Sequence, residues 1–171
     1  SDAVRFSRRR SEDDGPEDYS YIWRQSIESD IRDHSRRVES ILVSGVRDAA
    51  ESLIKADIVK IDDVIRTLEQ QKWKVFQRIV LYILKVFPDQ ALEFAAARLT
   101  DRSLFEDGGV RCEYARLLNQ CFKKLEPKQQ RIILDWIEKG PDLEEFKRSS
   151  ERLTGKRPTD EEAEKHLKYW Q

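Results

Sequence analysis

The feature that most constrains the fold of this 171-residue chain is a stretch from residue 72 to residue 99 that is apolar on nearly every side. Four polar residues interrupt the run between Trp73 and Phe87: Lys74, Gln77, Arg78 and Lys85. At helical pitch, the three basic residues form one narrow polar stripe. A helix that is apolar nearly all round must be covered by neighbours on several faces. We therefore expect this stretch to supply the central helix of an all-helical domain.

Apolar residues recur at a spacing of three to four along most of the remaining chain, which predicts further helices. These cover residues 17–34, 37–55, 61–70, 89–99, 110–125 and 127–139. Two more helices finish the chain. Asp142 with Glu145 resembles an N-terminal capping box, and Thr159 with Glu162 is one. Because the break near Ser35 is weak, the first two helices are also compatible with one long helix. The expected fold is all-α, with seven or eight helices stacked as antiparallel pairs.

Three local predictions concern packing and loops. On the helix over residues 37–55, seven apolar residues share a face that we expect to point inward: Val38, Ile41, Leu42, Val46, Ala49, Ala50 and Leu53. Residues 101–109 are predicted as a loop, because Asp107-Gly108-Gly109 is a turn signal. All four tryptophans lie on apolar seams, which favours core packing: Trp23, Trp73, Trp136 and Trp170.

An internal period supports a repeat architecture. Pro88 and Pro127 are 39 residues apart, and at the same offset apolar residues coincide, as Ile83 does with Phe122. Both units consist of a helix, a short corner containing proline, and a second helix. A helix pair that recurs at about 40 residues is typical of HEAT and armadillo-like solenoids. We expect residues 17–171 to form one such domain and residues 1–16 to form a flexible tail or linker. The lack of methionine and an amphipathic pattern that runs to Gln171 favour a piece of a longer protein.

The repeat units also carry a resemblance. Arg111-Cys112-Glu113-Tyr114, Leu117-Leu118 and the run from Trp136 to Asp142 resemble the helical-repeat regions of large bacterial multidomain proteins. Some of those proteins carry an NTPase or effector domain elsewhere and are thought to act in defence against phage. The resemblance covers about a third of the chain. It implies an accessory or sensor region and transfers no functional residue.

Composition and motifs exclude several classes of function. No apolar run is long enough to cross a membrane, and no secretory signal peptide is recognisable. Gly155-Lys156-Arg157-Pro158 lacks the remaining residues of a phosphate-binding loop and is interpreted as a helix stop. His34 and His166 have no Cys or His near them in the sequence, so no metal site, cofactor site or catalytic residue is predicted. Cys112 and Cys121 fall on opposite faces of one helix and cannot form a disulfide there. A reducing, cytoplasmic setting fits.

Charge is the one uneven feature. The net charge is −1, yet residues 72–131 hold 12 basic and 7 acidic residues. Five of these basic residues are candidates for contact with a polyanion or a protein partner: Lys74, Arg78, Lys85, Arg111 and Arg116. The simpler interpretation is a solvated face whose long side chains cover apolar surface. The functional one is a positive groove for nucleic acid or an acidic protein.

From these observations we expect a non-catalytic segment that binds protein or senses a signal within a larger bacterial protein. Its partner would be another protein or the remaining domains of its own chain, and not a membrane. One alternative is a nucleic-acid-binding helical module that uses the basic residues. The other is an enzyme whose site forms from residues scattered along the sequence.

Overall fold

The computed structural model describes residues 18–28, 38–140 and 143–167, and the predicted tail therefore lies outside the described residues. Those ranges are all-helical, with no strand, as predicted. They hold ten α-helices, more than the seven or eight expected, and one 3-10 turn at Phe122–Lys124. The α-helices are α1 (Ser20–Trp23), α2 (Val38–Lys55), α3 (Ile61–Glu69), α4 (Lys74–Val86), α5 (Leu92–Leu99), α6 (Arg102–Glu106), α7 (Arg111–Cys121), α8 (Pro127–Lys139), α9 (Leu143–Thr154) and α10 (Asp160–Leu167).

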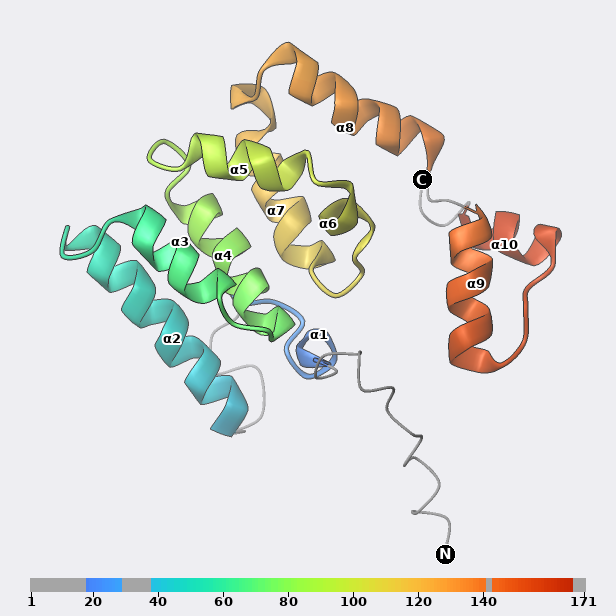
Figure 1. Ribbon diagram of the computed structural model, residues 1–171, viewed down its shortest axis with the longest axis horizontal. Helices are drawn as coiled ribbons and strands as arrows, with labels where there is room; N and C mark the ends of the chain where they lie inside the picture. Colours follow the sequence, from blue (N-terminus) through green and yellow to red (C-terminus); the bar gives the residue numbers. More distant parts are fainter. Residues whose placement is uncertain (1–17, 29–37, 141–142, 168–171) are drawn as a thin grey trace, which may run out of the picture.

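Helix α4 is the central helix, which confirms the prediction from its sequence. It packs against α1, α2, α3, α5 and α7, and lies in the middle of the helical stack in Figure 1. Six of its residues are buried: Arg78, Ile79, Val80, Leu81, Ile83 and Leu84. Burial of each large aliphatic side chain contributes about 1.5–3 kcal/mol. The continuous apolar surface of α4 thus organises the core by offering a packing face to each neighbour.

The corner between α4 and α5 contains Pro88, as expected, but α5 begins only at Leu92, after a turn. The predicted loop over residues 101–109 was partly wrong, because it contains the short helix α6. Asp101 explains that helix, since its carboxylate accepts a hydrogen bond from the backbone N–H of Ser103 at 2.9 Å and caps the first turn.

The predicted helix over residues 17–34 was also wrong in extent. Only α1 is helical between residues 18 and 28, and the rest of the prediction lies outside the described residues. The chain leaves the helix at Arg24, which is extended (φ −138°, ψ 93°). The backbone carbonyl of Arg24 accepts a hydrogen bond from Arg78, and the N–H of Ile27 donates to Glu113. These long-range partners replace the helical hydrogen bonds that the local sequence pattern favours.

Helix α2 has the predicted length but the opposite orientation. Its buried residues are Ser40, Val43, Ser44, Arg47, Ala50 and Ile54. Of the seven residues expected to point inward, only Ala50 is buried. The inward face holds both polar and apolar residues, and its serines accept hydrogen bonds from the Arg24 guanidinium, at 2.7 Å (Ser40 carbonyl) and 3.0 Å (Ser44 Oγ). The apolar face is consequently left on the outside.

The end of α2 is a Schellman motif. The N–H of Ile58 donates to the carbonyl of Leu53, and the N–H of Asp57 donates to that of Ile54, each at 3.0 Å. Asp57 adopts φ +53°, in the left-handed region that this motif requires. The chain then turns towards α3, so that this cap sets the crossing between the two helices.

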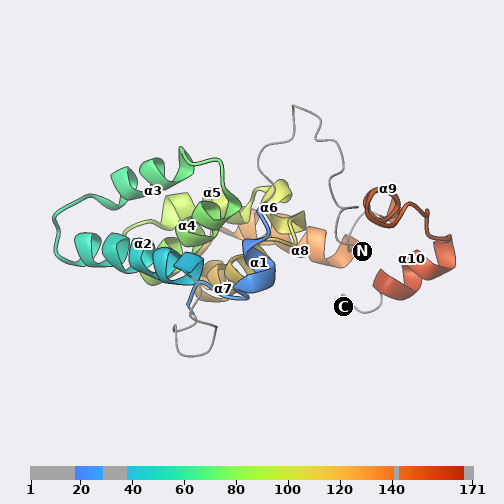
Figure 2. The same ribbon diagram turned by 90° about the horizontal axis from the view of Figure 1, so that it is seen from below.

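The C-terminal helices lie to one side. Figures 1 and 2 both show α9 and α10 side by side, apart from the stack around α4. The capping box of Thr159 and Glu162 is present, as predicted, whereas Asp142 lies outside the described residues. Trp136 on α8 packs against Phe105 with ring centroids 5.4 Å apart. Trp23 packs partly buried against the core, and Trp170 lies outside the described residues. Trp73 is 47% exposed at the start of α4, so the prediction that it packs in the core was wrong.

Candidate functional site

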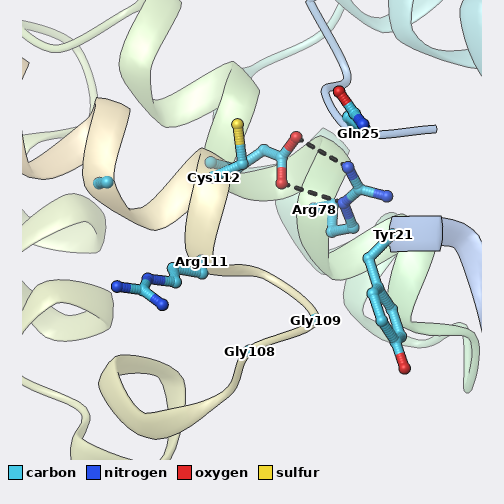
Figure 3. A pocket seen from close by; sticks show the side chains of 9 residues that line it. Tyr21, Gln25, Arg78, Gly108, Gly109, Arg111 and Cys112 are labelled. Carbon is cyan, nitrogen blue, oxygen red and sulfur yellow. Dashed lines mark hydrogen bonds and ion pairs between the residues drawn. The ribbon is translucent and has the colours of Figure 1, made fainter. Parts of the chain in front are cut away.

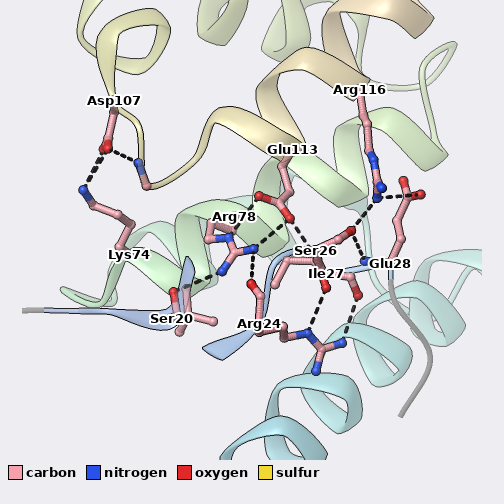
Figure 4. Close-up of polar contacts among 12 residues, drawn as sticks. Ser20, Arg24, Ser26, Ile27, Glu28, Lys74, Arg78, Asp107, Glu113 and Arg116 are labelled. Atoms are coloured by element: carbon pink, nitrogen blue, oxygen red, sulfur yellow. Dashed lines mark hydrogen bonds and ion pairs between the residues drawn. The ribbon is translucent and has the colours of Figure 1, made fainter. Parts of the chain in front are cut away.

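The polar stripe of α4 faces the segment over residues 18–28 (Figure 4). At its centre, Arg78 forms a bidentate ion pair with Glu113 of α7, with Nε–Oε2 at 2.9 Å and Nη2–Oε1 at 3.0 Å. Nη2 also donates to the carbonyl of Arg24 at 2.7 Å, and Nη1 to Ser20 Oγ at 3.3 Å. Arg78 is fully buried and Glu113 is 3% exposed. The interaction thus joins three segments that are far apart in the sequence.

The two ends of the same segment are also held, one by the backbone of α4 and the other by Lys85 of the stripe and Arg116 of α7. Asp18 caps α4 by accepting a hydrogen bond from the N–H of Val75 at 2.6 Å. At the far end, Glu28 pairs with Lys85 at 2.7 Å and with Arg116 at 3.0 Å. Carboxylates at both ends therefore fix an otherwise mostly non-helical segment across α4 and α7.

Two further arginines connect this segment to α2. Arg47 donates to the carbonyl of Ile27 at 2.6 Å, and Arg24 donates to the same carbonyl at 3.0 Å. Burial is the main cause that lowers the pKa of Arg24, and the charges of Arg47 and Arg78 lower it further. A guanidinium stays protonated under such conditions. Its fixed fork of donors makes it suited to joining several backbone carbonyls.

The five basic residues predicted as contacts are thus placed in different surroundings. Lys74 pairs with Asp107 at 2.8 Å, and Arg78, Lys85 and Arg116 bind Glu113 or Glu28. Arg111 is exposed at the start of α7. In this conformation Arg78 faces Glu113 and is withdrawn from solvent. It is therefore not part of a solvated face, and its guanidinium is not presented to a polyanion. Contact of the others with a partner stays a prediction.

Sequence reasoning missed the partner of Arg78. A single arginine within an otherwise apolar helix requires a buried partner, because an unpaired buried charge is strongly unfavourable. Glu113 lies 35 positions further along the chain, on a helix that was otherwise assigned to the core. Its spacing carried no local signal. The identity of the pair therefore became visible only with the packing of α4 on α7.

A hollow of about 410 Å³ lies beside this network (Figure 3). Its lining includes Tyr21, Arg78, Arg111, Cys112 and Glu113. Glu113 is the one carboxylate of that lining, and its oxygens accept hydrogen bonds from Arg78 and the N–H of Ile27. An acid–base mechanism needs a group that is ready to exchange a proton with a substrate. Because both oxygens of Glu113 are already engaged in hydrogen bonds, its carboxylate is held as a structural partner of Arg78.

Both cysteines of α7 are free, in agreement with the prediction that they do not bridge. Cys121 is fully buried, and burial raises the pKa of its thiol. Cys112 is partly exposed at the hollow. Within the described ranges, no group of three or more His, Cys, Asp or Glu residues is arranged to hold a metal ion. Nor does any helix there have the length and apolar character needed to cross a membrane.

The second feature that the sequence did not reveal is an apolar surface on α2. We call it the α2 ridge and define it by Val38, Ile41, Leu42, Val46, Ala49 and Leu53, all of them exposed. Val38 and Leu42 are 68% and 63% exposed. Gly45 lies within the ridge, and a Cβ there would meet nothing within 4 Å. The regular spacing of Ser40, Ser44 and Arg47 on the opposite face is the signal that could have revealed this orientation.

Comparisons with known proteins give no further guide to this site. No family model, no curated protein and no solved structure matches the chain.

Proposed function

We propose that this chain is a non-catalytic segment through which a larger bacterial protein binds another protein or senses a signal in the cytoplasm. The α2 ridge carries the proposal. Its members form one continuous row of exposed apolar side chains, and contiguous patches of this kind mark interaction surfaces more often than scattered apolar residues do. Covering a single Leu or Val side chain contributes about 1.5–3 kcal/mol. The ridge thus has enough apolar surface to support binding.

The proposed architecture is a short HEAT-like solenoid of antiparallel helix pairs. Two observations favour it. The pairs α4–α5 and α7–α8 both contain a corner with proline, and the prolines of the two corners, Pro88 and Pro127, are 39 residues apart. In addition, α2 lies at the edge of the stack in Figure 1, with α3 and α4 on its inner side. Solenoid units bury apolar faces against their neighbours, so an apolar outer face on an edge helix fits this arrangement.

The basic residues offer weaker support for a nucleic-acid-binding module. Lys74, Lys85 and Arg116 already pair with Asp107 or Glu28. A polyanion would have to compete with these carboxylates. That alternative therefore stays a prediction that no contact among the described residues favours.

Site-specific photo-crosslinking tests the proposed function. A photoreactive amino acid replaces Leu42 on the ridge in the full-length protein, expressed in its native cell. The matched control places it at Gln70, which is exposed at the end of α3. We expect a discrete crosslinked protein from position 42 and none from position 70. Equal yields at both positions would contradict a binding role for the ridge.

A further inference from the structure

The shape of the α2 ridge indicates what kind of structure covers it. The ridge extends along a helix of 18 residues, which spans about 27 Å at a rise of 1.5 Å per residue. Its centre contains two small residues, because Gly45 and Ala49 come between the larger Leu42 and Leu53 along the helix. A side chain of a second helix can enter such a gap, as in the packing of ridges into grooves. A partner helix that lies along α2 would thus fit both the length of the ridge and its pattern of large and small side chains.

The charges beside the ridge indicate the chemistry of that helix. Glu39 borders the ridge on one side and Asp48 on the other, and both are exposed. Asp48 also pairs with Arg47, but its side chain remains 58% exposed. The one exposed basic residue of α2 is Lys55, which is bound to Glu51. The borders of the ridge therefore present mostly negative charge to an approaching partner.

We propose that the α2 ridge binds an amphipathic helix of a partner protein whose apolar stripe is bordered by Lys or Arg. This inference rests on the proposed function and adds the chemistry of the partner. Apolar contact supplies the affinity, and the basic borders select among amphipathic helices by pairing with Glu39 and Asp48.

Two other occupants fit the charges less well. In an antiparallel dimer of α2 with a second copy, two-fold symmetry places each border against its own equivalent. Asp48 would then approach Asp48 of the other copy. A membrane surface rich in anionic lipid would likewise meet Glu39 and Asp48 with like charge.

Binding of two designed peptides to the full chain tests the proposal. Both peptides are helical and carry the same leucine stripe, but one has lysine and the other glutamate along the borders. We expect the lysine peptide to bind about tenfold more tightly in fluorescence anisotropy, since two exposed ion pairs are gained and two repulsions avoided. Leu42→Glu should abolish binding of both peptides. The double variant Glu39→Lys with Asp48→Lys should reverse the preference, and circular dichroism verifies that each variant is folded.

Equal affinity for the two peptides would overturn the inference that the partner helix carries basic residues along its borders. So would a concentration-dependent dimer that Leu42→Glu dissociates, or binding of the chain to vesicles of anionic lipid. These outcomes are separable from failure of the proposed function, because crosslinking at position 42 reports protein contact whatever the charge of the partner. Loss of that crosslink would overturn both.

Discussion

Arg78 and Glu113 form a bidentate ion pair in the middle of the core, and both side chains are withdrawn from solvent. Helices α4 and α7 carry the two residues, while the carbonyl of Arg24 and the N–H of Ile27 complete their hydrogen bonds. The pair therefore links α4 and α7 to the segment over residues 18–28. Because each charge is satisfied only by the other and by fixed neighbours, removal of one leaves the other buried without its counter-ion.

Glu113→Gln should therefore lower the free energy of unfolding by about 3–5 kcal/mol, the cost of removing one partner of a buried ion pair. Denaturation in urea, followed by circular dichroism, measures the change. The matched control is Asp135→Asn, which breaks the exposed pair of Asp135 with Arg131. An exposed pair contributes about 0–1 kcal/mol. Equal effects of the two substitutions would contradict a structural role for the buried pair.

The orientation of α2 gives a second prediction, which compares two residues on opposite faces of one helix. Leu42→Glu changes a side chain that is 63% exposed, so the free energy of unfolding should change by no more than about 0.5 kcal/mol. Ile54→Glu places a carboxylate at a position that is 6% exposed. We expect it to cost at least ~4 kcal/mol, because an unpaired charge is buried. Urea denaturation of the two variants under identical conditions tests which face of α2 is buried. A larger loss of stability for Leu42→Glu than for Ile54→Glu would mean that the face expected from the sequence points inward.

These two cases show what can be predicted from this sequence. The central position of α4 was predictable because a helix with apolar residues on all sides is stable in water only when other helices cover all of those sides. The orientation of α2 was not, since hydrophobic periodicity assumes that the most apolar face is buried. Here the Arg24 guanidinium requires acceptors, and Ser40 and Ser44 supply them from the less apolar face. The spacing of Ser40, Ser44 and Arg47 marks that face in the sequence, but Arg24, the donor that makes it the buried one, comes from another segment.

The basic residues illustrate the same limit. Lys74, Arg78 and Lys85 were correctly placed on one stripe of α4, and their location was predictable from helical pitch alone. Their partners were not, because Asp107, Glu113 and Glu28 come from three other segments. Net charge counted along the sequence therefore indicated a positive surface, whereas tertiary packing pairs these three residues with carboxylates.

The cap of α2 gives a third prediction. Asp57 adopts φ +53°, a conformation in which a side chain causes strain and glycine does not. Asp57→Gly should raise the free energy of unfolding by roughly 0.5–1 kcal/mol, because the relief of backbone strain exceeds the added freedom of the unfolded chain. The control is Asp62→Gly in the first turn of α3, where glycine should destabilise by a similar amount. Thermal unfolding measures both, and a lower melting temperature for Asp57→Gly would contradict the role of the left-handed cap.

The hairpin of α9 and α10 gives a prediction on pH. Lys147 binds Glu144 and Asp160, and these hydrogen bonds lower the pKa of both carboxyls below their ordinary values of 4.5 and 3.8. A lowered pKa in the folded state means that the contribution to stability is complete above the ordinary values. It is lost as the pH falls through the lowered ones. The hairpin should therefore loosen in acid ahead of the core around α4, because α9 and α10 pack mainly on each other and can open without it.

Backbone NMR resonances report this difference residue by residue. During an acid titration, the amide signal of Ala163 on α10 should shift or broaden at a higher pH than that of Leu81 on α4. In the Lys147→Gln variant both carboxyls lose their shared ammonium partner, while Glu144 keeps its ion pair with Arg157. The pKa values of Glu144 and Asp160 should therefore rise part of the way towards the ordinary ones. The hairpin of that variant should also be looser at neutral pH. A common midpoint for Ala163 and Leu81 in the unsubstituted chain would instead mean that the hairpin and the core unfold as one unit.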